Sequence, residues 1–432
     1  MSKRAPHDAA PRADRAVVAT LVLPGSAAEE AHDPLEEISA LAEAAGANVV
    51  GGISQRLPKI NARAAFGKGK IAEIGALAKE LDASVVIIDH PLSPSQGVNL
   101  EKDLCVRVVD RTELILDIFA SRAQTRQASL QVELAQLEYM RTRLRRMWTH
   151  LERTEGAIGS RGPGETQLET DRRLVNKKIT DLKRKLTAIE TRRRREAMGR
   201  EYPCTVSLVG YTNVGKSSLL TALTGAEVLI ADQLFATLDT RIRNWQVGEG
   251  RQVILADTVG FVRDLPHGLV ASFHATLEET IQADLLLHVC DASAPDLDLQ
   301  IASVETVLEE IGAKEIPTVL VMNKLDRVST DERLLLTRRF PDAIFLSVKS
   351  KEGIDDLRAE VAAFLDRWAL LLELEIPAEH GRLLSDVRRV GSVREEGYRE
   401  DQWVAEVRLM PRHWSALQPD ILAAGGQFRV LP

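Results

Sequence analysis

The chain has 432 residues, of which 44% are hydrophobic and 28% are charged, and its formal net charge at pH 7 is −7. This composition suits several folded domains, and no apolar run approaches the ~20 residues that span a bilayer. We expect a cytoplasmic protein with no signal peptide and a disordered start over residues 1–15, and we leave peripheral association with membranes open. The widely spaced cysteines indicate reduced thiols without metal-ligand spacing: Cys105, Cys204 and Cys290.

Residues 16–120 alternate between strand-like and helix-like segments. Strands are expected at 17–23, 47–54, 84–89 and 106–109, and amphipathic helices at 34–45 and 69–81. This alternation predicts a small parallel α/β domain. Residues 67–70, Gly-Lys-Gly-Lys, lack the spacing of a phosphate loop, and nothing in this part of the sequence indicates catalysis.

The segment 121–200 is strongly basic although the whole chain is acidic. It holds 20 Lys and Arg against 10 Asp and Glu. Apolar residues recur there at alternating steps of four and three, from Leu130 to Leu151 and from Leu168 to Ile189. Two such stretches separated by about 16 residues predict an antiparallel helical hairpin. Its tip, residues 154–165, is too rich in glycine to be helical.

A basic segment on an acidic chain is the usual footprint of contact with a polyanion such as RNA. We predict that RNA is contacted by arginines toward the tip of the hairpin, namely Arg141, Arg145, Arg146 and Arg161. The alternative is a solvated, charged hairpin that only spaces the domains.

A phosphate-binding loop is predicted at 210–217, which read Gly-Tyr-Thr-Asn-Val-Gly-Lys-Ser and follow the strand-like run 205–209. A strand that leads through a glycine-rich turn into a helix aims backbone N–H groups and the helix dipole at polyphosphate. Lys216 would reach the β and γ phosphates, and Ser217 would bind Mg²⁺.

Two further segments are expected to respond to the γ-phosphate. In 235–239, Phe-Ala-Thr-Leu-Asp, nucleotide-switch proteins place a threonine on magnesium, and we favour Thr237 over Thr240. The strand-like run 253–256 ends in Asp-Thr-Val-Gly, where Asp257 would hold magnesium through water and the Gly260 amide would sense the γ-phosphate.

Guanine selectivity is predicted from Asp326, which follows a buried strand-like run at 319–322. Its carboxylate can accept hydrogen bonds from N1 and N2 of guanine, whereas adenine offers an acceptor at N1 and would leave the charge unpaired. Asn323 would bond the O6/N7 side of the purine or tie back to the phosphate loop. The stem of Lys324 would lie over the base.

The strand-like run 343–346 precedes a backbone amide expected to read the guanine oxygen. Because these motifs follow the carboxyl ends of predicted strands, they indicate a doubly wound α/β site. The predicted nucleotide-binding residues are Gly210, Tyr211, Thr212, Asn213, Val214, Gly215, Lys216, Ser217, Ser218, Phe235, Ala236, Thr237, Leu238, Asp239, Asp257, Thr258, Val259, Gly260, Asn323, Lys324, Leu325, Asp326, Ser347, Val348 and Lys349. Catalytic roles are expected for Lys216, Thr237 and Gly260, and magnesium ligation for Ser217, Thr237 and Asp257.

Two residues bear on how hydrolysis would be triggered. Phe261 follows Gly260, where Ras-like proteins carry a water-positioning glutamine, and a phenyl ring cannot orient water by hydrogen bonding. Either another group positions the water or turnover is slow until a partner binds. Asn213 indicates a K⁺ ion that substitutes for an arginine finger, or else an asparagine that only shapes the loop.

Residues from about 370 onward predict a small α+β domain, with strands at 371–376 and 403–409 and helices at 381–390 and 414–424. A contact with tRNA or the ribosome, dimerisation and simple stabilisation all remain open as its role.

Several stretches together resemble the HflX family of GTPases. They are 85–89, 110–119, 131–137, 162–169, 210–217 and 231–239, of which the Gly-Pro-Gly-Glu stretch from residue 162 is the most specific. The resemblance implies GTP hydrolysis stimulated by the ribosome, binding to the large ribosomal subunit, and splitting or rescue of stalled ribosomes under stress. The alternative function is a nucleotide-sensing RNA-binding or adaptor protein with negligible turnover and a non-ribosomal partner.

We therefore predict a monomeric, multidomain α/β protein. Its predicted parts are a disordered start (1–15), a parallel α/β domain (16–120), a basic helical hairpin (121–200), a P-loop GTPase domain (201–369) and an α+β domain (370–432).

Overall fold

The computed structural model describes residues 13–147, 163–198, 204–225, 235, 241–248, 251–263 and 280–431. These residues form two compact units. The first unit holds residues up to Thr187 together with Phe235 and Arg263, and the second holds the remaining described residues. The mixed α/β class expected from the sequence is confirmed.

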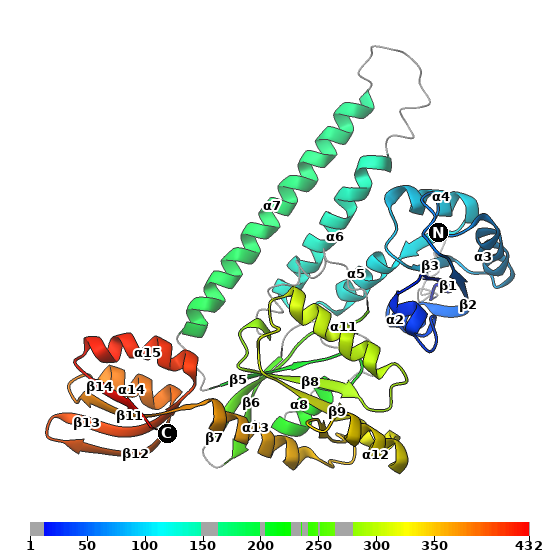
Figure 1. Ribbon diagram of the computed structural model, residues 1–432. Coiled ribbons are helices and arrows are strands. Elements are labelled where there is room, and N and C mark those ends of the chain that lie inside the picture. The colour runs from blue at the N-terminus through cyan, green and yellow to red at the C-terminus, as the bar shows by residue number, and fades with distance from the viewer. Residues whose placement is uncertain are drawn as a thin grey trace, which may run out of the picture. The chain divides into compact units, whose positions relative to one another are not determined.

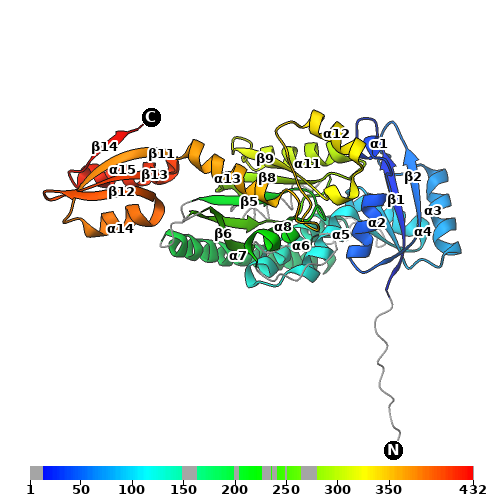
Figure 2. The ribbon, with the colours of Figure 1, turned by 90° about the horizontal axis from the view of Figure 1, so that it is seen from below.

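The first unit contains a four-stranded parallel sheet in the order β2-β1-β3-β4. Its strands are β1 (Arg15–Val22), β2 (Asn48–Arg56), β3 (Val85–Asp89) and β4 (Arg107–Asp110). Its helices are α1 (Ala27–Glu30), α2 (Glu36–Ala44), α3 (Lys68–Glu80), α4 (Pro94–Leu104) and α5 (Arg111–Arg122). Helices α2 and α5 pack together on one face and α3 and α4 on the other (Figure 2). Because helices cover both faces, seven consecutive residues of β1 are buried.

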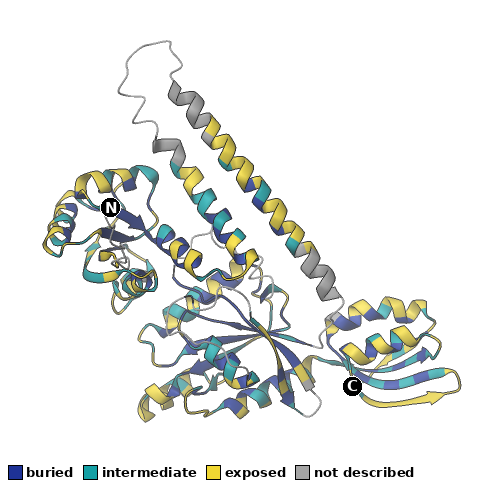
Figure 3. Cartoon of the chain, turned by 180° about the vertical axis from the view of Figure 1, so that it is seen from behind, coloured by how far each residue is buried: buried dark blue, intermediate teal, exposed yellow. Residues whose placement is uncertain are grey.

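The basic hairpin also belongs to this unit over most of its length. Helix α6 (Arg126–Met147) runs antiparallel to α7 (Pro163–Met198), as the heptad pattern predicts (Figure 1). The helices meet along Leu130, Leu134, Leu137, Val175, Ile179, Leu182 and Leu186. The other side of α7 is largely exposed (Figure 3). Residues 163–165 were predicted to be part of a non-helical tip, and that was wrong, because proline at a first helical position has a suitable φ.

The second unit contains a six-stranded sheet in the order β10-β9-β8-β5-β7-β6, in which β6 alone pairs antiparallel. Its strands are β5 (Thr205–Val209), β6 (Arg241–Gly248), β7 (Arg251–Asp257), β8 (Leu285–Asp291), β9 (Thr318–Asn323) and β10 (Ile344–Phe345). Its helices are α8 (Lys216–Thr224), α11 (Leu297–Glu310), α12 (Thr330–Arg339) and α13 (Ile354–Trp368), with a short 3₁₀ helix, η2 (Leu325–Arg327). The carboxyl ends of the parallel strands therefore share one edge.

The C-terminal part of the second unit has its own antiparallel sheet, ordered β12-β13-β11-β14. Its elements are β11 (Leu370–Pro377), α14 (Gly381–Val390), β12 (Ser392–Arg399), β13 (Gln402–Leu409), α15 (Pro411–Ala423) and β14 (Gln427–Val430). The two edge strands, β12 and β14, were not predicted, because their side chains are mostly exposed and lack an apolar alternation. Among the described residues, no helix is long and apolar enough to cross a membrane.

Candidate functional site

The turn between β5 and α8 is shaped by glycine. Gly215 caps α8 with φ of 97°, and a Cβ placed on it would lie 2.5 Å from Nδ2 of Asn323. A side chain is therefore excluded by both the backbone conformation and the space. The turn delivers the chain to the N-terminus of α8, where free backbone N–H groups and the helix dipole favour an anion.

Lys216, the first residue of α8, is buried against this turn. Its Nζ donates to the carbonyl oxygens of Gly210, at 2.9 Å, and Tyr211, at 2.7 Å. Burial lowers the pKa of Lys216 to about 8, an effect that the negative charge of Asp257 partly offsets. An incoming phosphate would thus meet an ammonium group that is already desolvated and held in the loop.

Ser217 and Asp257 come together from different elements. The Ser217 hydroxyl donates to Oδ2 of Asp257 at 2.6 Å, and Asp257 is fully buried at the end of β7. The neighbouring Thr258 hydroxyl donates to the carbonyl of Leu208 at 2.7 Å, which holds the end of β7 against β5. A hydroxyl and a carboxylate at this place fit Mg²⁺, which prefers few protein oxygens together with phosphate and water. No cluster of three His, Cys, Asp or Glu suited to a metal occurs in the described ranges.

Gly260 and Phe261 lie directly on the phosphate loop. Phe261 accepts a hydrogen bond from the Thr212 amide at 2.8 Å, and its own amide donates to the Gly210 carbonyl at 3.1 Å. A Cβ on Gly260 would lie 2.9 Å from Cα of Thr212 and 3.1 Å from Nζ of Lys216. Only glycine allows this approach, so the Gly260 backbone lies in close contact with the phosphate loop.

The predicted base-recognition residues lie beyond β9. Asn323 donates through Nδ2 to the Val214 carbonyl at 2.8 Å, which is the tie to the phosphate loop that was one of its two predicted roles. Its Oδ1 accepts from the Val348 amide at 3.2 Å. Asp326 accepts a hydrogen bond of 2.6 Å from the Ser347 hydroxyl, and this bond is the main reason that the pKa of Asp326 is lowered. The Asp326 carboxylate is therefore ionised and oriented at neutral pH.

Lys324 has a partner that sequence reasoning missed. It adopts φ of 62°, and its Nζ contacts the Asn213 carbonyl at 2.7 Å and Asp291 Oδ2 at 2.8 Å. Asp291 ends β8, a strand of fully buried residues flanked by β5 and β9. The signal that could have found it is the same one that marks Asp257, an apolar run that ends in a carboxylate.

The remaining predicted residues divide between described and undescribed parts of the chain. Val214, Val259 and Leu325 are buried, Ser218 lies in the first turn of α8, and Lys349 approaches Asp326 at 3.9 Å. Phe235 is described and belongs to the first unit. Ala236, Thr237, Leu238, Asp239 and Arg161, and the side chains of Arg145 and Arg146, lie outside the described residues.

His288 predicts a pH dependence of stability for the second unit. Burial on β8, and secondarily the nearby Lys216, lowers the pKa of His288 to about 4. The unfolded chain therefore binds this proton from about pH 6.5 downward and the folded chain only near pH 4, so stability falls as pH falls through that window. The loss attributable to His288 should be about 3 kcal/mol. Urea unfolding of the wild type and of His288→Leu from pH 7 to 4 measures it, and equal slopes with pH would contradict the assignment.

Known protein families match three consecutive parts of the chain. Three family models match: "GTP-binding GTPase N-terminal" at residues 32–120, "GTP-binding GTPase Middle Region" at 122–200 and "50S ribosome-binding GTPase" at 205–324. The chain is 46% identical over 396 residues to the GTPase HflX of Escherichia coli K12, covering 89% of this chain and 92% of that protein. This chain belongs to the HflX family of GTPases.

A second HflX GTPase, from Magnetococcus marinus, is 41% identical over 424 residues, which cover 97% of this chain and 98% of the relative. A solved structure of a protein named SsGBP in complex with GDP aligns at 24% identity and a TM-score of 0.45, covering 81% of this chain and 98% of that chain. Membership of the HflX family establishes that the chain binds and hydrolyses GTP. The resemblance drawn from the sequence motifs is thereby confirmed.

Proposed function

We propose that GTP binds along the carboxyl edge of the six-stranded sheet and that this HflX-family GTPase acts on the large ribosomal subunit, splitting or rescuing stalled ribosomes under stress. The observation that carries the nucleotide site is that the ends of four strands supply its residues: Lys216 and Ser217 follow β5, Asp257 ends β7, Asp326 follows β9 and Ser347 follows β10. Support for the ribosomal target is the family description at 205–324, which names 50S ribosome binding.

In this proposal each group at the site has a distinct role. Lys216 exchanges its two carbonyl partners for β and γ phosphate oxygens and stabilises the charge that develops during transfer. The Gly260 amide bonds the γ-phosphate. Ser217, Asp257 and Thr237 would hold Mg²⁺, which when bound neutralises charge on the β and γ phosphates.

Phe261 supports a trigger that comes from outside the site. Its ring is buried and cannot bond water, and its backbone is engaged by the phosphate loop. The proposal is therefore that intrinsic hydrolysis is slow and that a bound ribosomal subunit completes the positioning of the attacking water.

A potassium ion at Asn213 is the second part of the catalytic proposal. The carbonyl of Asn213 accepts a hydrogen bond from Lys324, so the loop backbone is held in place at Asn213. A K⁺ ion held by Asn213 would supply positive charge to the phosphates during hydrolysis. Replacing K⁺ by Na⁺ in a GTPase assay should lower turnover about tenfold or more, and Asn213→Ala should remove the difference between the two ions. Equal rates in both salts would leave Asn213 as a loop-shaping residue.

The basic hairpin is proposed as the RNA-binding part. Arg141 is exposed near the end of α6, whereas Arg143 is bonded to Asp110 and is not available in the same way. Reversing the charge of Arg141, Arg145 and Arg146 should weaken binding to ribosomal RNA and reduce the salt slope by about one for each lost phosphate contact. Binding measured over a salt series tests this. Reversing three arginines of α12, namely Arg333, Arg338 and Arg339, is the control with an equal change in charge.

Cosedimentation with purified large subunits tests the proposed target. More protein should pellet with subunits in a non-hydrolysable GTP analogue than in GDP. If the nucleotide makes no difference, the ribosomal proposal fails, and the adaptor with a non-ribosomal partner becomes the better account. We also retain as proposals the domain limits 16–120, 121–200, 201–369 and 370–432, a monomeric state and a cytoplasmic location.

A further inference from the structure

Arg263 lies three residues after Gly260 but is buried in the first unit, against helices α2 and α5. Its Nε contacts Oε2 of Glu37 at 2.7 Å, and its backbone carbonyl accepts a hydrogen bond of 2.6 Å from the guanidinium of Arg111. Arg111 in turn pairs with both Glu37 and Asp89. The exposed fractions of the four side chains are 10% or less, so the two positive and two negative charges balance one another away from water.

The cluster of Arg111, Arg263, Glu37 and Asp89 lies at the carboxyl end of β3, whose last residue is Asp89. Strands β1 and β3 are neighbours whose following helices cover opposite faces of the sheet, and their ends are joined where Thr20 bonds Asp89. Ligands of open α/β sheets bind at such a point, outside the carboxyl ends of the strands. Here the position beside Asp89, Glu37 and Arg111 receives an arginine of the chain itself.

The other γ-phosphate-responsive segment makes an independent contact with the same helix. Phe235, the residue before Ala236 and Thr237, packs edge-on against Phe119 with ring centroids 4.7 Å apart and planes at 80°. Each ring is 2% exposed. Phe119 and Arg111 both belong to α5, so one helix contacts a residue from each of the two segments.

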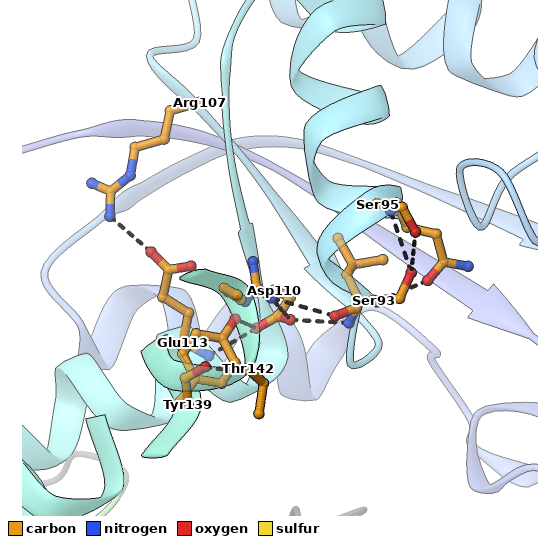
Figure 4. Close-up of polar contacts among 10 residues, drawn as sticks. Ser93, Ser95, Arg107, Asp110, Glu113, Tyr139 and Thr142 are labelled. Atoms are coloured by element: carbon orange, nitrogen blue, oxygen red, sulfur yellow. Dashed lines mark hydrogen bonds and ion pairs between the residues drawn. The ribbon is translucent and has the colours of Figure 1, made fainter. Parts of the chain in front are cut away.

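Helix α5 is also joined to the hairpin through Asp110, its N-cap residue (Figure 4). The Asp110 carboxylate accepts from the Glu113 amide at 2.9 Å and from the Leu92 amide at 3.0 Å. From α6, the Tyr139 hydroxyl donates to it at 2.8 Å and Arg143 forms an ion pair with it. Asp110 is 2% exposed, so the start of α5 cannot shift without disturbing α6.

We propose that α5 acts as a relay between the nucleotide and the hairpin. It contacts both segments that are expected to respond to the γ-phosphate, and a shift of α5 would change its contacts with α6. A buried, balanced ion-pair cluster has discrete arrangements, since a half-withdrawn Arg263 would leave Glu37 with an incompletely compensated charge. Movement of Gly260 toward a γ-phosphate would pull on Arg263 through the two residues between them. Movement of the segment 235–239 would reach α5 through the contact between Phe235 and Phe119. The proposal deepens the regulation of the nucleotide site and rests on the proposed function only for the site's location.

By linkage the relay works in both directions. A partner that holds the hairpin in one arrangement shifts the relative affinity for GTP and GDP by the same factor by which the nucleotide shifts partner binding. A trigger bound at the hairpin can therefore act on the nucleotide site through α5.

Hydrogen exchange of the full-length protein tests the relay without ribosomes. In the wild type, amides of α5 and α6 should exchange at rates that differ at least about threefold between the GDP complex and the complex with a non-hydrolysable GTP analogue. In Arg263→Ala and in Phe119→Leu this difference should be lost, while protection of the phosphate loop by nucleotide persists. Both changes keep the ion pairs of Arg111 with Glu37 and Asp89, whereas Arg263→Ala removes the pair between Arg263 and Glu37.

Arg63→Ala is the matched control, because it removes an arginine of the same unit whose partner Asp103, at 3.0 Å, lies away from α5. It should keep the wild-type difference. Identical exchange of α5 in the two wild-type complexes, or an unchanged difference in Arg263→Ala, would overturn the relay. Absence of nucleotide protection at the phosphate loop would instead refute the proposed site, and the two failures are distinguishable in one data set.

Discussion

Lys216→Ala should reduce GTP turnover by about 10²–10³-fold, the cost of removing one preorganised positive group from a phosphoryl-transfer site. The large effect is expected because Lys216 is buried, and two carbonyl bonds hold its ammonium group against the proposed phosphate loop. Single-turnover GTP hydrolysis measures the change in the chemical step.

A suitable control for Lys216 is Lys68→Ala. Lys68 begins α3, in the sequence Gly-Lys-Gly-Lys at residues 67–70, which lacks the spacing of a phosphate loop. Its removal should leave turnover within a factor of about two, as for a surface substitution. Turnover retained in Lys216→Ala would mean that the nucleotide site is misplaced.

Asp326→Asn should change the base preference of the protein from guanine to xanthine. The lowered pKa of Asp326, caused mainly by the bond from Ser347, keeps a carboxylate where the two guanine N–H donors need acceptors. Asparagine would place a donor there, so GTP affinity should fall about 10²–10³-fold. Affinity for xanthosine triphosphate should rise, since its oxygen at C2 can accept from the new amide.

Competition binding with GTP, ATP and xanthosine triphosphate measures that exchange. Asp331→Asn, an exposed carboxylate in the first turn of α12, is the control and should leave the order of affinities unchanged. Equal loss for all three triphosphates would indicate that Asp326 supports the fold and does not read the base.

Local patterns predicted several elements of the fold, although the central strand β8 was not among them. The strand expected at 205–209 is β5, and the helix expected at 381–390 is α14, with the same limits. These segments are either continuous apolar runs or strongly amphipathic, so burial alone decides their conformation. Helix α12 was not predicted, because none of its residues is buried and its sequence therefore lacks an apolar stripe. The one local signal for this helix is the capping box formed by Ser329 and Glu332.

Contacts between distant parts of the chain could not be predicted in the same way. The bond between Arg111 and Arg263 joins residues 152 positions apart, and neither residue has a local pattern that pairs it with the other. Arg143 lies between Arg141 and Arg145 in the same basic segment, yet it forms an ion pair with Asp110. The sequence shows that a helix is basic, but only the fold shows which of its charged side chains form ion pairs within the protein.

The proposed nucleotide site combines local motifs, which the sequence predicts, with contacts that depend on the order of the strands. Each motif was predictable because a phosphate loop or a carboxylate after a strand is a local feature, and parallel strands bring such ends to one edge. The pairing of Lys324 with Asp291 depends on β8 lying between β5 and β9, an order that no single segment specifies.

We propose that a large ribosomal subunit triggers GTP hydrolysis at this site. The most direct measurement is the GTP turnover of the purified protein alone, with large subunits and with small subunits at equal concentrations. Large subunits should raise turnover at least about tenfold and small subunits should not, because Phe261 leaves water positioning to the bound partner. Turnover that is unchanged by saturating large subunits, in protein shown to bind GTP, would mean that the large subunit does not trigger hydrolysis.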